Sequence, residues 1–264
     1  MTRVRLKRRV LLSAQVRTAL TIAGSDSGGG AGIQADLKSF ASIGVHGTSV
    51  ITCVTAQNTR AVDSIFAIPT AEIRKQLRAV LDDFDVRAAK TGMLYSAGIV
   101  RAVANGLRRT SFPLVVDPVM IATVGARLEK DDFQAALVTP NRYEAERLSG
   151  LPIRDVTSME AAARAIRRLG PQAVLVKGGH LKGPLVDVLF DGVRMVRLGG
   201  RRYRKALHGA GCTLAASTAA YLALGHPLLE SVRRARRKVA AGFRASYRAG
   251  HGVEIINSQI TGGR

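Results

Sequence analysis

Short runs of β-branched and other apolar residues alternate along this chain with stretches whose apolar positions recur every three or four residues. The first pattern is typical of buried strands and the second of amphipathic helices. Strands are predicted at Ala19–Gly24, Ser49–Thr55, Ala88–Thr91, Leu114–Val116, Ala136–Thr139, Ala173–Lys177 and Asp187–Phe190. Helices are predicted at 31–43, 71–83, 96–109, 141–149, 158–169, 211–224 and 227–247. This alternation indicates an α/β protein with one mostly parallel sheet covered by helices on both faces.

The chain of 264 residues has no internal repeat or low-complexity linker, so we expect residues 18–264 to form a single domain. Residues 1–17 are rich in Arg and Lys and contain no acid. We expect them to form a poorly ordered basic arm. A mitochondrial-type presequence and an overlong start assignment are the alternatives, whereas the apolar run is too short for a secretory signal.

Composition narrows the protein class. No apolar run approaches the roughly 18 residues that a membrane-spanning helix needs, so no membrane partner is expected. Two cysteines are too few for a disulfide framework and favour a reducing cytoplasm. The 40 Lys and Arg against 19 Asp and Glu give a net charge of +21, but the arginines are spread along predicted helices. We therefore expect a solvated basic surface, with nonspecific polyanion affinity as the alternative and no dedicated nucleic-acid partner.

Two glycine-rich runs lie where ligands bind in such sheets, at strand ends and helix starts. Residues 25–32 (SDSGGGAG) follow the first strand, and residues 208–213 (HGAGCT) open an Ala-rich helix. The first run is not a Walker A loop, and a purely structural turn is its alternative. Backbone N–H groups at the second run could hold an anion, and the same potential would lower the pKa of Cys212 and make it a proton acceptor. A small buried residue closing the helix against the sheet is an equal alternative for Cys212.

Four polar residues at other strand ends are weak signals on their own. Asn141 and Glu144 stand three apart at a helix start, where their oxygens could hold a hydrated Mg2+ and phosphates, but Asn is also an ordinary N-cap. Lys177 could meet a phosphate or be merely exposed, and Asp117 could be a functional carboxylate or a turn residue. The other cysteine, Cys53, is expected in the core of a strand.

Taken in order, the motifs closely resemble those of the hydroxymethylpyrimidine/phosphomethylpyrimidine kinases of thiamine biosynthesis. The resemblance covers about residues 18–250 and rests on residues 23–36 (AGSDSGGGAGIQAD), 56–59 (AQNT), 90–94 (KTGML), 117–120 (DPVM), 139–141 (TPN), 177–180 (KGGH) and 208–213. It implies a ribokinase-like three-layer αβα sandwich, ATP with Mg2+, a homodimer, and two successive phosphorylations of a hydroxymethylpyrimidine.

The resemblance also implies roles for individual residues. Gln57 would pair with the pyrimidine, since its amide offers one donor and one acceptor. Ala31, Asp36, Met93 and Val119 correspond to other pocket positions, although Asp36 could be a solvated helix residue and Met93 and Val119 plain core. Asn141 and Glu144 would help to hold Mg2+ and phosphates, with Asp117 and Lys177 near the phosphoryl path. Gly209, Ala210, Gly211 and Cys212 would form the anion hole, with Cys212 as the base.

Three departures from the family pattern keep alternatives open. Ala210 replaces a common Thr, Thr123 occupies a position often held by Lys, and only fifteen residues, 126–140, separate Gly125 from Asn141. A trimmed surface helix or weakened nucleotide binding would both explain the short segment. The alternatives to the pyrimidine kinase are a pyridoxal or pyridoxine kinase, although those usually have Asp in place of Cys212, and a catalytically impaired pyrimidine-binding relative.

Overall fold

A computed structural model describes residues 16–119, 135–179, 181, 183–203 and 205–261. Its strands are β1 (Thr18–Asp26), β2 (His46–Gln57), β3 (Val62–Ala67), β4 (Val86–Thr91), β5 (Leu114–Val116), β6 (Leu137–Val138), β7 (Val174–Val176), β8 (Leu185–Phe190) and β9 (Met195–Gly200). In this part of the chain they form one nine-stranded sheet in the order β3-β2-β1-β4-β5-β6-β7-β8-β9. Six adjacent strands, β2, β1, β4, β5, β6 and β7, run parallel, and β3, β8 and β9 are antiparallel to their neighbours.

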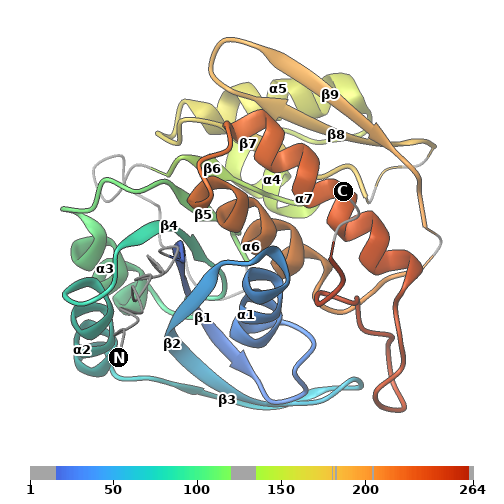
Figure 1. The fold of residues 1–264 in the computed structure, drawn as a ribbon. Helices are drawn as coiled ribbons and strands as arrows, with labels where there is room; N and C mark the ends of the chain where they lie inside the picture. The colour runs from blue at the N-terminus through green and yellow to red at the C-terminus, as the bar shows by residue number, and fades with distance from the viewer. Residues whose placement is uncertain (1–15, 120–134, 180, 182, 204, 262–264) are drawn as a thin grey trace, which may run out of the picture.

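Helices cover both faces of this sheet (Figure 1). They are α1 (Gly32–Ile43), α2 (Thr70–Leu81), α3 (Ala97–Leu107), α4 (Arg142–Ser149), α5 (Val156–Arg167), α6 (Ala210–Ala223) and α7 (Leu228–Arg244). One face carries α1, α6 and α7, and the other carries α2 and α3 at one end and α4 and α5 at the other. The predicted three-layer αβα architecture is therefore confirmed. None of the described helices is long and apolar enough to cross a membrane.

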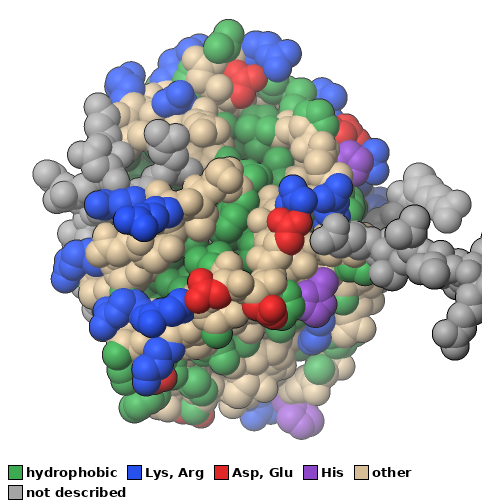
Figure 2. All heavy atoms as spheres, turned by 60° about the vertical axis from the view of Figure 1, so that its left-hand side comes forward, with side chains coloured by type: hydrophobic (Ala, Val, Ile, Leu, Met, Phe, Trp, Pro, Cys, Tyr) green, Lys and Arg blue, Asp and Glu red, His purple; other side chains and the backbone are tan. Residues whose placement is uncertain are grey.

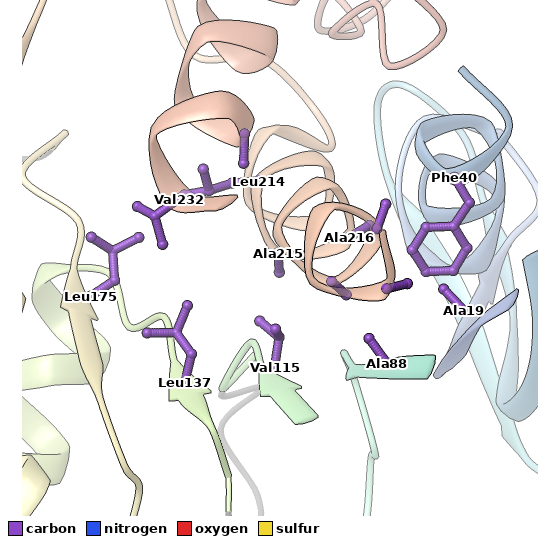
Figure 3. Packing of buried hydrophobic residues seen from close by; sticks show 14 of the residues in the cluster. Ala19, Phe40, Ala88, Val115, Leu137, Leu175, Leu214, Ala215, Ala216 and Val232 are labelled. Atoms are coloured by element: carbon purple, nitrogen blue, oxygen red, sulfur yellow. The ribbon is translucent and has the colours of Figure 1, made fainter. Parts of the chain in front are cut away.

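The central helix α6 lies close to the sheet because its buried residues are small. Ala215 and Ala216 are completely buried, and Figure 3 shows Ala215 pointing toward Val115 of the sheet and Ala216 on the side of the helix nearer Phe40 of α1. Alanine side chains let the helix axis approach the strands, while larger residues at these positions would overpack the interface. This packing fixes the start of α6, and with it Cys212, at the carboxyl ends of the central strands.

The sequence predicted each of its seven strands and seven helices to within three residues at either end. Two strands were missed. All residues of β3 are at least partly exposed, so β3 has no apolar face to reveal it. The strand β9 follows an Asp191-Gly192 turn in which Gly192 has a φ of 94°, and this dipeptide is a recognised hairpin signal. The predicted basic arm lies outside the described residues except for Val16 and Arg17.

Lys and Arg side chains are scattered over the face shown in Figure 2 rather than gathered in one patch. Several of the arginines pair with acids on the surface, as Arg197 does with Glu160 and Arg234 with Glu230. Exposed ion pairs of this kind contribute little to stability.

Candidate active site

A cavity of about 190 Å³ opens at the carboxyl ends of β1, β2 and β4, beside the start of α6. Five residues singled out by the sequence line it: Ala31, Gln57, Met93, Val119 and Cys212. Lys90, Asp26 and His208 also line its wall. The volume is below the range of pockets for drug-sized ligands, so the cavity suits a small molecule. Residues far apart in the chain are thus brought together in the arrangement that the motif order predicted.

The two glycine-rich runs touch each other at this cavity. Gly209 is the N-cap of α6 and has a φ of 86°, and a side chain there would collide with the backbone oxygen of Gly30. Only glycine combines this conformation with such a close approach. The backbone N–H of Gly32, in the first run, donates to the thiol of Cys212. The contact between the runs explains the glycines at positions 30 and 209.

The start of α6 supplies free backbone donors. The first hydrogen bond of the helix runs from the N–H of Thr213 to the carbonyl of Gly209, 2.9 Å away. The N–H groups of Ala210, Gly211 and Cys212 therefore have no partner within the helix. Because Ala210 contributes only its backbone here, the replacement of a common Thr by Ala leaves this set of donors intact. Such donors at a helix start stabilise negative charge.

The thiol of Cys212 differs from what its position at a helix start predicts. Burial raises its pKa to about 11, although the ammonium of Lys90 and the N–H of Gly32 act in the opposite direction. The expectation of a lowered pKa was therefore wrong. It considered the potential of the helix end and neglected the loss of solvent around the sulfur. Cys212 is a protonated thiol at neutral pH in the protein without ligands.

Lys90 and Asp36 form a completely buried ion pair below the cavity. The ammonium of Lys90 lies 2.8 Å from the carboxylate of Asp36, which also accepts a hydrogen bond from the Thr21 hydroxyl at 2.6 Å. Burial opposes the charge on Lys90, but the neighbouring Asp36 overcomes it and raises the pKa of the lysine. Asp36 is not among the residues that line the cavity, and its charge acts on Lys90 and on the thiol of Cys212. The complete burial of Asp36 excludes the solvated helix position that was its alternative.

A second polar cluster gathers Lys177, Asp117, Glu144 and Asn141 at the ends of β5, β6 and β7. The ammonium of Lys177 lies 3.0 Å from the carboxylate of Asp117 and 3.9 Å from that of Glu144. Burial opposes its charge, but these two acids outweigh burial and raise the pKa of Lys177. Asn141 and Glu144 cap α4 reciprocally, so two of the four cluster residues also form the cap of this helix.

Gly211 joins the cavity to this second cluster. A side chain on Gly211 would lie 3.4 Å from the carboxylate of Asp117 and 3.7 Å from the ammonium of Lys177. Cys212, the next residue, lines the cavity. A phosphoryl group lying across Gly211 would therefore have the cavity on one side and the Lys177 cluster on the other.

Three residues of this site were given no role from the sequence: Lys90, Asp26 and His208. All three stand within the quoted motifs, and this is the signal that could have identified them. Met120, Thr123 and most of the short segment 126–140 lie outside the described residues, as does His180. Cys53 is completely buried in β2, as expected.

A three-layer αβα fold, a helix start rich in free donors and an adjacent small-molecule cavity define a small-molecule kinase of the ribokinase-like class. The phosphomethylpyrimidine kinase family matches residues 26–257 of the chain. The chain therefore belongs to the phosphomethylpyrimidine kinase family.

Individual relatives agree with this assignment. The chain is 49% identical to a hydroxymethylpyrimidine/phosphomethylpyrimidine kinase of Rhizobium meliloti over 87% of this chain and 91% of that protein. It is 48% identical to a thiamine biosynthesis bifunctional protein of Geobacter sulfurreducens, over 91% of this chain but only 52% of that longer protein. Among solved structures, an ADP complex of Bacillus subtilis pyridoxal kinase superposes with a TM-score of 0.85 at 36% identity, covering 92% of this chain and 97% of that one.

Proposed function

We propose that this protein transfers a phosphoryl group from ATP to 4-amino-5-hydroxymethyl-2-methylpyrimidine and then phosphorylates the monophosphate to the diphosphate, in thiamine biosynthesis. The observation that carries the proposal is the placement of Gln57 and Cys212 on the wall of one small cavity at the donor-rich start of α6. Family membership and the relatives named as kinases of this pyrimidine support it.

In the proposed reaction, Gln57 binds the pyrimidine and the hydroxymethyl oxygen attacks the γ-phosphorus of ATP. Cys212, in its thiolate form, takes the proton of that hydroxyl as the new P–O bond forms and the bond to the β-phosphate breaks, releasing ADP. The N–H groups at Gly209 to Cys212 donate hydrogen bonds to the phosphoryl oxygens and stabilise their negative charge. Lys90, beside Cys212, favours the thiolate form during this step.

The Lys177 cluster suits the nucleotide side of the reaction. Mg2+ is usually held by one or two carboxylates together with water and phosphate oxygens. The carboxylates of Asp117 and Glu144 on one ammonium, with the side-chain oxygen of Asn141 nearby, fit that donor set. Glu144 and Asn141 would hold the ion, and Lys177 and Asp117 would bind or position the phosphates. Mg2+, when bound, neutralises charge on the transferred phosphate.

Pyridoxal is the competing substrate, and the likeness to a Bacillus subtilis pyridoxal kinase is the observation that favours it. The two hypotheses are separated by incubating the purified chain with ATP and Mg2+ and measuring kcat/KM for the pyrimidine alcohol, for its monophosphate and for pyridoxal. The proposal expects turnover of both pyrimidines with a higher kcat/KM for the alcohol than for pyridoxal. A preference for pyridoxal would overturn it, and pyrimidine binding without ADP release would identify an impaired relative.

We also propose that residues 18–264 act as one domain, that the protein works in the cytoplasm and that it forms a homodimer. The two cysteines are unpaired, as is usual in a reducing compartment. The β2–β3 edge exposes Phe66 at 67%, with its cross-strand partner Val54 and nearby Val62 also exposed, and a second copy would cover these apolar side chains. Light scattering of the wild type and of Phe66→Glu tests the dimer, since the charge should shift the mass to that of a monomer.

A further inference from the structure

The carboxylate of Asp26, on the cavity wall, is saturated with hydrogen-bond donors. One oxygen accepts from the backbone N–H of Gly28 at 2.8 Å. The other accepts from the N–H groups of Gly30 at 3.1 Å and Ala31 at 2.8 Å, and lies 2.8 Å from Nε2 of His208. These contacts hold the pKa of Asp26 below its ordinary value despite its burial. Asp26 is therefore an ionised group that only accepts hydrogen bonds.

This saturation fixes the proton on His208. Nε2 lies against a carboxylate oxygen, so it must carry hydrogen and donate, in the neutral imidazole as well as in the imidazolium. A ring nitrogen that carries hydrogen has no lone pair with which to accept another hydrogen bond. Any further polar atom in contact with Nε2 must consequently be an acceptor.

The side-chain amide of Gln57 makes that further contact. In the structure the amide nitrogen lies 3.2 Å from Nε2 of His208, and the amide oxygen lies 3.1 Å from the hydroxyl of Thr55. The oxygen and nitrogen of an amide have nearly the same shape, so the surrounding hydrogen bonds decide which end is which. A nitrogen facing His208 would set two donors against each other. An oxygen there would accept from Nε2.

The contact with Thr55 at the opposite end of the amide favours the same orientation. The Thr55 hydroxyl has one hydrogen, and the backbone carbonyl of Ser25 lies 3.0 Å away to receive it. Thr55 can then accept from an amide nitrogen of Gln57 while it donates to Ser25. With the oxygen toward His208 and the nitrogen toward Thr55, the Gln57 oxygen shares the Nε2 hydrogen with Asp26, the nitrogen donates to Thr55, and no two donors face each other.

We propose that His208 is a positioning residue that holds the Gln57 amide with its oxygen toward His208 and its nitrogen toward Thr55, and thereby selects a 4-aminopyrimidine over a 4-oxopyrimidine. This inference rests on the proposed function, because it assumes that Gln57 pairs with the ring. A 4-aminopyrimidine presents an amino donor beside a ring-nitrogen acceptor. The 4-oxo compound presents an acceptor beside a ring N–H donor. The fixed amide pairs with the first order and opposes the second.

Without His208 the amide loses its fixed direction. Thr55 is then the only one of the two neighbours left to orient the amide, and its hydroxyl can give up the hydrogen bond to Ser25 and donate to an amide oxygen instead. The amide could then turn to pair with either ring. The consequence is a loss of discrimination between the two rings rather than a uniform loss of activity.

The test compares 4-amino-5-hydroxymethyl-2-methylpyrimidine with its 4-oxo analogue in the wild type and three variants. His208→Phe keeps an aromatic ring without a donor. His208→Gln places an amide N–H near the position of Nε2, and His208→Asn places it near that of Nδ1. We expect the wild type to prefer the amino compound by about 100-fold or more in kcat/KM. His208→Phe should reduce this preference to about 5-fold or less, through a higher KM for the amino compound, and His208→Gln should restore it better than His208→Asn.

Equal losses on both compounds in His208→Phe, with the preference retained, would assign His208 a merely structural role and overturn the inference. A His208→Gln variant no more selective than His208→Phe would do the same. Failure of the proposed function is a different result, because the wild type itself would then leave the amino compound unphosphorylated. Binding of an ATP analogue is measured in parallel, and its loss identifies a variant that has not folded. If His208→Phe is unfolded, selectivity is compared between His208→Gln and His208→Asn.

Discussion

Removing one partner of the buried Lys90–Asp36 pair should destabilise the protein strongly. Both side chains are completely buried, and their charged atoms are 2.8 Å apart. At that distance the attraction is at most about 6 kcal/mol for an effective dielectric constant near 20. Much of this offsets desolvation, but Lys90→Met leaves the Asp36 carboxylate buried without its counter-charge. We expect a loss of about 3–5 kcal/mol in the free energy of unfolding.

The assay is equilibrium unfolding in urea of Lys90→Met, Asp36→Leu and the double variant. Because the double variant buries no unpaired charge, it should recover most of the loss and unfold within about 2 kcal/mol of the wild type. Glu72→Gln is the matched control. Glu72 and Lys75 are 2.7 Å apart, but both are exposed, so breaking this pair should cost less than about 1 kcal/mol. A loss below about 1 kcal/mol in Lys90→Met, or strict additivity in the double variant, would refute the reasoning.

Three further predictions concern one thiol, one glycine and one buried lysine. Because the pKa of Cys212 is raised to about 11 and a base must be deprotonated, kcat/KM should rise steadily from pH 7 to pH 9 without a plateau; a plateau at pH 7 would contradict this role. Gly209→Ala should lower the free energy of unfolding in urea by more than about 2 kcal/mol, because of its φ of 86° and the contact with Gly30. Gly150→Ala, at a φ of 71° in open space, should lower it by only about 1 kcal/mol. Equal losses would refute the contact. Burial lowers the pKa of Lys238 to about 8, so folding disfavours its charged form, and the free energy of unfolding should rise as the pH increases from about 8 toward the unfolded pKa near 10.5. Over this range the wild type should gain up to about 3 kcal/mol relative to Lys238→Met. Parallel pH profiles of the two proteins would exclude a lowered pKa of Lys238.

The sequence was sufficient for the order of the elements and for the gathering of the motifs, because buried parallel strands and amphipathic helices leave clear periodicities. The sequence was insufficient for properties that depend on burial and on long-range contacts. Lys90 at a strand end has the pattern of an exposed lysine, and only the packing of α1 against β1, the neighbour of β4 in the sheet, reveals its pairing with Asp36. The pKa of Cys212 depends on solvent exclusion, which local sequence does not record. The orientation of Gln57 depends on His208, which lies 151 residues away in the chain.

Phosphoryl transfer by Cys212→Ala is the most direct test of the account. The wild type and Cys212→Ala are incubated with ATP, Mg2+ and the pyrimidine alcohol, and monophosphate formation is followed together with urea unfolding. Cys53→Ala, which removes the other thiol from the core of β2, is the control. The account predicts that Cys212→Ala stays folded and loses about 100- to 10,000-fold in kcat, while Cys53→Ala keeps its activity. Turnover of Cys212→Ala at the wild-type rate would contradict it.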